Sequence, residues 1–139
     1  MLKGTVRTYD DEVREQIEKE IKKIIDHTCS MYDAKGTLEY RHGYPPVINH
    51  EAETQLAADL AHDIPGVERV TETEPVMSAE DFAYYLQKVK GSFIFVGAKH
   101  PTRESAYPHH HPKFDFDERA MLIAAKLLGK TALAYLDKD

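Results

Sequence analysis

Hydrophobic side chains recur along this chain with two periods, and each period predicts a different kind of element. Spacings of three and four residues are typical of one helix face, whereas alternation or a short unbroken apolar run is typical of a strand. The stretches with helical spacing are residues 11–29, 50–64, 82–89 and 117–136. The stretches with strand character are residues 2–9, 36–42, 67–73 and 92–97. Helices and strands are therefore predicted to alternate, which is the order of an α/β fold.

The first predicted helix is amphipathic and has an acidic start. Asp10 and Asp11 stand where an aspartate can cap free backbone N–H groups and interact favourably with the helix dipole. An apolar stripe follows at helical spacing, made of Val13, Ile17, Ile21, Ile24 and Ile25. Cys29 continues this stripe, so it is expected to be a small core residue rather than a nucleophile or a metal ligand. With a strand on each side of the helix, residues 1–43 are predicted to form a β-α-β unit.

A turn-forming run, Gly43-Tyr44-Pro45-Pro46, breaks the pattern and is interpreted as a domain boundary. It divides the chain into a first domain of residues 1–43 and a second of residues 44–139. Shortly after the run, Asn49 is the expected N-cap of the next helix. Ser78 is the expected cap of the short third helix, because its spacing to an acidic residue resembles a capping box.

Two stretches in the later part of the second domain are strongly apolar. Residues 92–97 form a nearly continuous apolar run, which fits a strand buried on both faces in an α/β sheet. The last helix, residues 117–136, is apolar around most of its circumference and is expected to pack between layers. The predicted fold class is therefore α/β.

Composition narrows the class of protein without indicating a function. The chain has 139 residues, of which 42% are hydrophobic and 30% charged, as in an ordinary globular domain. Its net charge of −6, with basic residues interspersed among acids, argues against a nucleic-acid surface. No apolar run approaches the ~20 residues of a membrane span, and the first residues have no signal-peptide character. The single cysteine excludes an internal disulfide and is expected of a cytoplasmic protein.

Candidate chemistry gathers in the run Pro108-His109-His110-His111-Pro112 and in the acidic, aromatic residues that follow it. Histidine is the commonest metal ligand in proteins, and the flanking prolines keep the three imidazoles off a regular helix. This loop could supply one or two imidazoles, and a carboxylate could come from Glu80, Asp81, Asp115 or Asp117. No complete ligand pattern such as HExxH or CxxC is present, so the residues alone leave two interpretations open. One is half of a metal site and the other is a solvated histidine-rich loop.

Four motifs, in this order and spacing, resemble the C-terminal part of the peptidase M20 family. They are Gly4-Thr5-Val6-Arg7-Thr8; Gly43-Tyr44-Pro45-Pro46 with Asn49; Met77-Ser78-Ala79-Glu80-Asp81-Phe82; and His110-His111-Pro112 with Phe114-Asp115-Phe116-Asp117-Glu118. The similarity is greatest to the amidohydrolase branch, which holds N-acyl-L-amino acid amidohydrolases and hippurate hydrolases. It implies the C-terminal part of a di-metal, exopeptidase-type α/β catalytic domain. A β-α-β piece of a lid and dimerisation domain, residues 1–43, would precede it.

The resemblance also implies roles for individual residues. His110 matches the position of the family's last metal ligand, two residues before a proline, whereas His109 and His111 are neighbours. The residues expected at the substrate are Ser78, Glu80, Asp81, Tyr44 and Arg7. Tyr44 departs from the many family members that carry an arginine there to hold a substrate carboxylate. No residue of this chain is expected to be the catalytic base, because the family's glutamate base and other metal ligands lie upstream of these motifs.

The function implied is hydrolysis of the amide bond of N-acyl amino acids by a divalent metal centre of Zn, Mn, Co or Ni. A cytoplasmic homo-oligomer that binds neither nucleic acid nor membrane is expected, and the 139 residues alone are expected to be inactive. Two other classes stay open. The chain could be a non-enzymatic fragment or interaction module, or a stand-alone metal-binding histidine loop.

Overall fold

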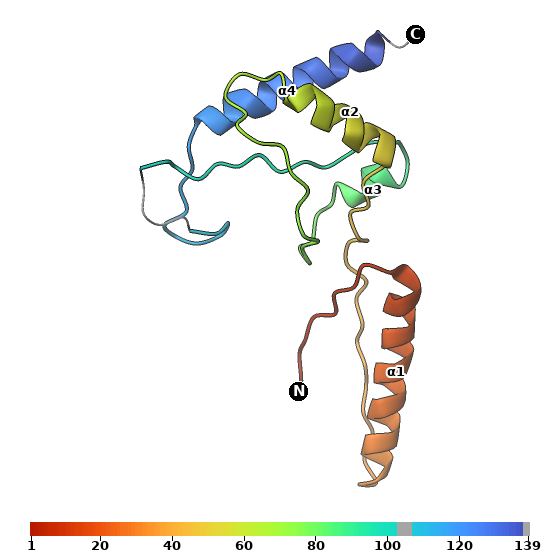
Figure 1. Cartoon of the computed structure of the whole chain (residues 1–139). Coiled ribbons are helices and arrows are strands. Elements are labelled where there is room, and N and C mark those ends of the chain that lie inside the picture. Colours follow the sequence, from red (N-terminus) through yellow and green to blue (C-terminus); the bar gives the residue numbers. More distant parts are fainter. Residues whose placement is uncertain (103–106, 138–139) are drawn as a thin grey trace. The chain divides into compact units, whose positions relative to one another are not determined.

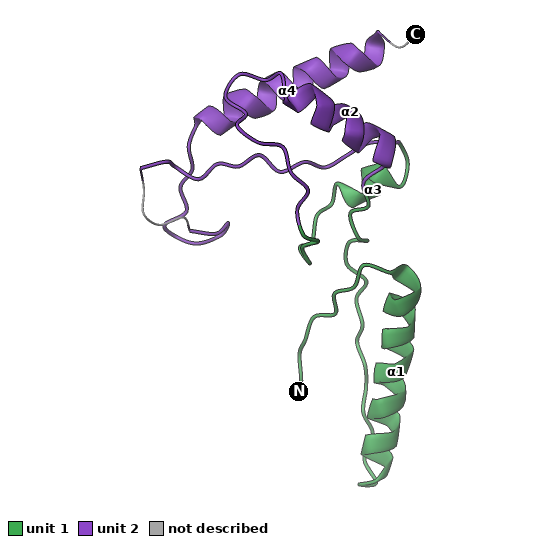
Figure 2. Cartoon of the chain, in the orientation of Figure 1, with its two compact units in different colours: residues 1–48, 74–89 green, residues 49–73, 90–139 purple. Residues whose placement is uncertain are grey.

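The computed structural model describes residues 1–102 and 107–137, and in these residues the regular structure is helical (Figure 1). The helices are α1 (Asp11–Ser30), α2 (Glu51–Ala61), α3 (Ala83–Leu86) and α4 (Arg119–Leu136). They fall into two compact units, drawn in green and purple in Figure 2. Unit 1 consists of residues 1–48 and 74–89, and unit 2 of residues 49–73 and 90–139. The helical stretches of the sequence are thus confirmed, with α2 and α3 shorter than expected.

The predicted α/β fold class is wrong, because the described residues contain no β-strand. The four stretches with strand character, residues 2–9, 36–42, 67–73 and 92–97, have no regular secondary structure. A strand exists through hydrogen bonds to a neighbouring strand, whereas an alternating sequence shows only that a segment suits a pleated, half-buried surface. Residues 1–43 are likewise not a β-α-β unit but a helix between two irregular segments.

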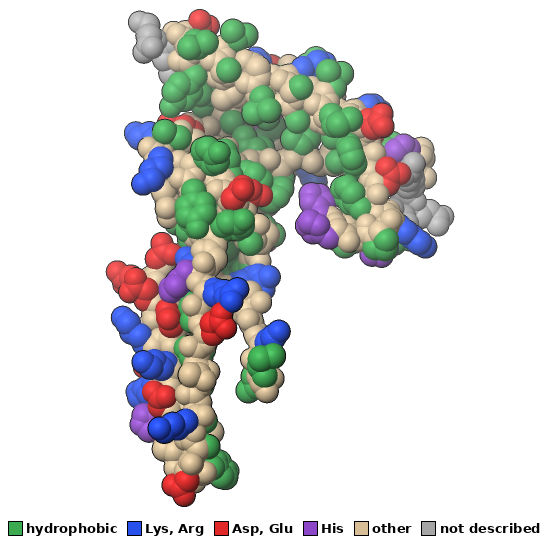
Figure 3. Space-filling model, turned by 180° about the vertical axis from the view of Figure 1, so that it is seen from behind, with side chains coloured by type: hydrophobic (Ala, Val, Ile, Leu, Met, Phe, Trp, Pro, Cys, Tyr) green, Lys and Arg blue, Asp and Glu red, His purple; other side chains and the backbone are tan. Residues whose placement is uncertain are grey.

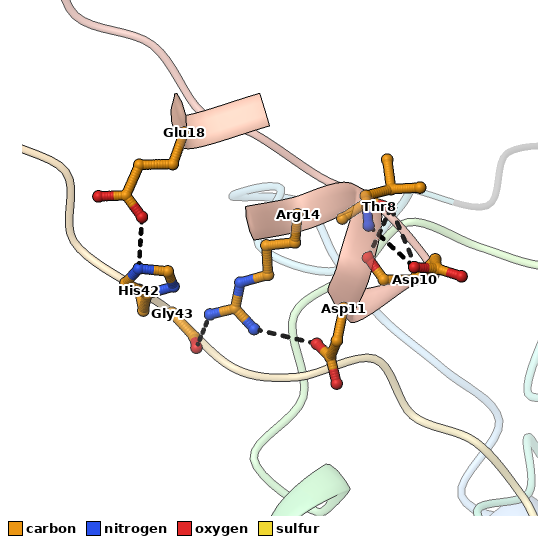
Figure 4. Close-up of polar contacts among 8 residues, drawn as sticks. Thr8, Asp10, Asp11, Arg14, Glu18, His42 and Gly43 are labelled. Atoms are coloured by element: carbon orange, nitrogen blue, oxygen red, sulfur yellow. Dashed lines mark hydrogen bonds and ion pairs between the residues drawn. The ribbon is translucent and has the colours of Figure 1, made fainter. Parts of the chain in front are cut away.

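Unit 1 is built on α1 and on the segment that follows it. The carboxylate of Asp10 accepts a hydrogen bond from the Val13 backbone N–H at 2.9 Å, as the predicted cap requires. Arg14 donates to the carbonyl of Gly43 at 2.7 Å, and the imidazole of His42 contacts Glu18 at 2.8 Å (Figure 4). Residues 36–43 therefore return along α1 in the opposite direction.

Gly36 is the point at which the returning segment lies closest to the helix. A Cβ at this position would stand 2.4 Å from a methyl carbon of Ile25 and 2.8 Å from the sulfur of Cys29. Both distances are too short for non-bonded atoms, so only glycine allows this approach. The predicted place of Cys29 on the apolar stripe is confirmed, although the thiol is half-buried rather than in a core.

Unit 2 has a small core between α2 and α4. Its buried members are Ala61, Ile64 and Leu127, with exposed fractions of 8%, 5% and 8%. Leu60, Val67, Val70 and Ile123 pack around them. At the edge of this contact Lys130 donates to the carboxylate of Asp63 at 2.8 Å. The two helices thus bury one shared apolar seam.

The outer face of α4 is not buried in the described residues, so its expected place between layers is wrong. Leu128, Leu133 and Leu136 are 73%, 64% and 73% exposed. Hydrophobic side chains accordingly cover much of the visible surface in Figure 3. Despite this apolar character, no helix in residues 1–102 and 107–137 is long and apolar enough to cross a membrane.

Neither expected side-chain cap after residue 43 is present. His50, not Asn49, precedes α2 as its N-cap, and the Asn49 side chain instead pairs with the backbone of Phe93. Its amide donates to the Phe93 carbonyl at 2.9 Å and accepts from the Phe93 N–H at 2.8 Å. Ser78 lies before the N-terminus of α3, and Phe82 is the N-cap of that helix. An asparagine can satisfy the backbone of a distant segment as readily as a helix end.

We expect Leu127→Ala to destabilise unit 2 by about 2–5 kcal/mol, because it removes a buried side chain and leaves a cavity. The matched control is Leu128→Ala, which truncates the next residue on the exposed face and should change stability by less than about 0.5 kcal/mol. Urea unfolding followed by far-UV circular dichroism measures both. Equal effects of the two substitutions would contradict the packing described.

Gly36→Ala should lower the stability of unit 1 by about 1–3 kcal/mol, the usual effect of forcing an extra carbon into a packed contact. The same substitution at Gly4, where a Cβ meets no described atom within 4 Å, serves as control. The ring signals of His42 in an NMR spectrum report whether the segment still lies beside Glu18. Unchanged His42 signals in Gly36→Ala would show that the close approach is not needed.

Candidate functional site

The histidine run forms a tight turn that presents His110. The backbone N–H of His111 donates to the carbonyl of Pro108 at 3.2 Å, which closes a four-residue turn. His110, the third residue of this turn, has a φ of 67°, whereas His109 has no positive φ. This pattern is that of a type II turn, in which the third residue must adopt a left-handed conformation. Glycine or asparagine usually fills that position, and a residue with a larger side chain costs about 1–2 kcal/mol there.

The imidazoles on either side of His110 have partners, and His110 has none among the described residues. His111 stacks on the ring of Tyr107 with 4.4 Å between centroids, and its Nδ1 accepts from the Lys113 backbone N–H at 3.1 Å. His109 meets Phe114 edge to face at 4.9 Å. The exposed imidazole of His110 forms no hydrogen bond or ion pair with another described residue. It is therefore the ring of the three that is available to a ligand.

The donor set of this chain fits one ligand of a metal site rather than a whole site. A protein metal site commonly needs three or four converging side chains. Within residues 1–102 and 107–137, no three histidines, cysteines or carboxylates lie close enough together to hold an ion. Glu80, Asp81, Asp115 and Asp117 therefore form no group of three or more possible ligands with the imidazoles in the described part of the chain.

An ion pair fixes the point where the loop meets α4. The Asp117 carboxylate accepts from the backbone N–H of Arg119 at 3.0 Å and from its guanidinium Nε at 2.9 Å. The hydrogen bond from the Arg119 guanidinium, and after it the one from the backbone N–H, lowers the pKa of Asp117 from 3.8 to about 2. The same pair raises the pKa of Arg119. The backbone N–H of Asp117 donates to the Ala98 carbonyl at 2.9 Å, so residues 98 and 117 meet at the base of the loop.

The residues expected at a substrate lie in unit 1. Tyr44, 51% exposed, meets Tyr84 edge to face with 5.8 Å between ring centroids, so it lies beside the helix that follows Glu80 and Asp81. Glu80 is half-buried, and its carboxylate accepts from the backbone N–H of Phe82 at 3.3 Å. The remaining three, Ser78, Asp81 and Arg7, have exposed side chains that form no hydrogen bond with another described residue.

Sequence reasoning missed two contributors to this site, although the sequence contains a signal for each. The first is the ion pair of Asp117 and Arg119, whose Asp-x-Arg spacing at a helix start allows one carboxylate to bind both a backbone N–H and a guanidinium. The other contributor is His111, which the sequence indicates only as a neighbour of His110. A histidine whose ring nitrogen can reach the N–H two residues on behaves as aspartate or asparagine does in a turn.

Comparison with models of known protein families shows to which family the chain is related. The sequence model described as "Peptidase family M20/M25/M40" matches residues 5–134. The chain belongs to this family. The resemblance seen in four sequence motifs is thereby confirmed, and M20 proteins are in general metal-dependent.

Individual M20 relatives match nearly the whole chain. "Putative amidohydrolase YhaA" of Bacillus subtilis (strain 168) is 49% identical over 97% of this chain and 34% of its own length. The N-acetyl-L-cysteine deacetylase of the same organism is 34% identical over 100% of this chain and 32% of its own length. The chain thus spans about a third of the length of the curated relatives it matches.

A solved structure has the same course of the backbone. The crystal structure of a "putative aminohydrolase" from methicillin-resistant Staphylococcus aureus matches with a TM-score of 0.76 and 38% sequence identity. The match covers 91% of this chain and 32% of the other. The backbone of this chain thus resembles part of a longer solved structure.

The ion pair at the start of α4 should be sensitive to strong acid only. Because the pKa of Asp117 falls from 3.8 to about 2 on folding, the pair stabilises the helix start above about pH 4. That stabilisation is lost as the pH falls through about 2. We expect the Asp117 carboxyl carbon to titrate near pH 2 by NMR. In Arg119→Gln the midpoint should rise but stay below the ordinary aspartate value, because the backbone N–H of residue 119 still donates to the carboxylate.

The control for this prediction is Lys126→Gln, which removes a cation of the same helix that pairs with no described residue. It should leave the Asp117 titration unchanged. A midpoint near pH 4 in the unsubstituted chain would show that the pair does not form in solution.

Proposed function

We propose that this chain is the C-terminal part of a metal-dependent amidohydrolase that cleaves the amide bond of N-acyl amino acids. The observation that carries the proposal is the M20 match over residues 5–134, nearly the whole chain. Relatives named as an amidohydrolase, an N-acetyl-L-cysteine deacetylase and an N-acetyldiaminopimelate deacetylase support this substrate class. In each of these proteins the matching region is about a third of the length.

In this proposal His110 supplies one imidazole to the metal centre. Its ring is exposed and has no partner among the described residues, and it stands on a turn closed by a backbone hydrogen bond. When bound, divalent ions such as Zn, Mn, Co or Ni would supply Lewis-acid activation of a water molecule. The catalytic base and the other ligands would come from the parts of an M20 enzyme that these motifs do not include.

The residues of unit 1 would bind the substrate. Arg7 carries an exposed guanidinium, which suits the carboxylate of an N-acyl amino acid. Tyr44 brings a hydroxyl and an aromatic face held against Tyr84, so it can border the acyl group but cannot neutralise a carboxylate. Ser78 and Asp81 offer polar side chains that bond to no other described residue, and Glu80 has its carboxylate oriented by a backbone N–H.

The wider organisation is proposed on the same family grounds. Residues 1–43 would belong to the lid domain and residues 44–139 to the catalytic domain, and the complete enzyme would be a cytoplasmic homo-oligomer. The exposed apolar face of α4 and the irregular segments of unit 1 are consistent with further protein surface covering them.

The 139 residues alone should show no turnover, because a single imidazole cannot assemble the metal centre. The assay is release of free amino acid from N-acetyl amino acids with Mn²⁺, Co²⁺, Ni²⁺ or Zn²⁺ added. In a longer hydrolase that contains this chain, His110→Ala should lower activity by more than about 100-fold, whereas His109→Ala should have little effect. Turnover by the isolated chain would refute the proposed division of the site.

The isolated chain and its His110→Ala variant also test the two other functions left open by the sequence. Tight binding of one metal per chain, lost in His110→Ala, would favour a stand-alone metal-binding loop. A defined assembly measured by light scattering, without metal binding, would favour an interaction module. The coding sequence upstream of Met1 would decide parentage directly, since an M20 enzyme needs its remaining ligands and its glutamate base there.

A further inference from the structure

We propose that His111 is a positioning residue, whose imidazole holds His110 in the conformation that presents it to a metal. The inference rests on the proposed role of His110 as a ligand, and it assigns to His111 a task distinct from metal binding. His111 would act through the backbone of the turn rather than by touching the ion.

Three hydrogen bonds meet at His111 and join two consecutive turns. Its backbone N–H donates to the Pro108 carbonyl at 3.2 Å, which closes the turn that contains His110. Its carbonyl accepts from the Phe114 N–H at 2.8 Å, which closes the turn that follows. Its ring Nδ1 accepts from the Lys113 N–H at 3.1 Å. The backbone of His111 is therefore fixed from both sides, and His110 lies next to it.

Of these three hydrogen bonds, only the one accepted by the imidazole ring of His111 depends on the identity of the side chain. A nitrogen that accepts from the N–H two residues on does what the carbonyl oxygen of asparagine does in an Asx-turn. The chain contains a second case, because Nδ1 of His100 accepts from the Thr102 N–H at 3.3 Å. Acceptance at Nδ1 places the proton of the neutral ring on Nε2.

His110 needs such support because its own conformation is unfavourable. A φ of 67° is uncommon for a residue with a side chain and persists where the surroundings impose it. The His110 ring has no described partner that could impose it. The bonds at His111 are the contacts nearest to it that fix the backbone.

A second contact of His111 could hold the turn instead, and the chain allows the two to be separated. The His111 ring lies flat against Tyr107, with an interplanar angle of 12°. Replacement by asparagine keeps an acceptor for the Lys113 N–H and removes the stacked ring. Replacement by phenylalanine keeps a stacked ring and removes the acceptor. His111→Asn and His111→Phe are thus matched opposites.

The experiment uses the 139-residue chain and two NMR readouts. The first is the NOE between the amide and α protons of His110, which is strong at positive φ because the two protons are then close. The second is a Zn²⁺ titration followed through the ring Hε1 signals. We expect His111→Phe to weaken the NOE and to raise the Zn²⁺ midpoint at His110 about tenfold, whereas His111→Asn preserves both. Unchanged signals of α2 and α4 show that each variant is folded.

Three results would overturn the inference. The NOE could survive in both variants, which would mean that the ring does not hold the turn. It could survive in His111→Phe but not in His111→Asn, which would assign the role to stacking on Tyr107. The Zn²⁺ midpoint could rise in His111→Asn while the NOE stays strong, which would make His111 a ligand rather than a positioning residue.

Failure of the proposed function gives a different result. If Zn²⁺ moves the His109 or His111 signals but leaves those of His110 unchanged in the unsubstituted chain, His110 loses its place as the ligand. The NOE comparison between His111→Asn and His111→Phe still decides whether His111 fixes the backbone of His110.

Discussion

Side chains that bond to distant backbone groups hold the irregular segments of this protein against its helices. The described residues have no strand ladder to bind the backbone of these segments, so side chains supply some of the hydrogen bonds. Arg14 binds the Gly43 carbonyl, and Asn49 binds both polar groups of Phe93. The backbone N–H of His50 adds a bond to the Gly91 carbonyl at 3.0 Å. Each of these contacts fixes one short stretch, so the segments are tied at points rather than along their length.

The helices could be predicted from the sequence because their signals are local. Asp10 lies three residues before the N–H that it caps, and the apolar stripe of α1 needs only the helix itself. The strands could not be predicted correctly, since alternation in residues 36–42 describes a half-buried surface that here lies along α1. Gly36 has no side chain, so the segment can lie close against α1 instead of pairing with a neighbouring strand.

For the candidate site too, features set by neighbouring residues could be predicted, whereas contacts between distant residues could not. The run of histidines and the M20 motifs were visible in the sequence, and they single out His110. The sequence did not show that Asn49 would bond across to Phe93 instead of capping α2, because both uses need the same amide. It also did not show the left-handed conformation of His110, which depends on hydrogen bonds made by the residues around it.

The contact between Gly36 and Cys29 gives the chain an internal reporter. The sequence contains a single cysteine, and its sulfur lies where the returning segment comes closest to α1. A reagent bulkier than a hydrogen atom needs that segment to move aside before it can reach the sulfur from this direction. Because the thiol is only half-buried, part of its reactivity comes from its exposed side, and movement of the segment away from the helix would raise the rate of thiol modification further. Any change elsewhere that loosens or tightens unit 1 would register at this one atom without the introduction of a label.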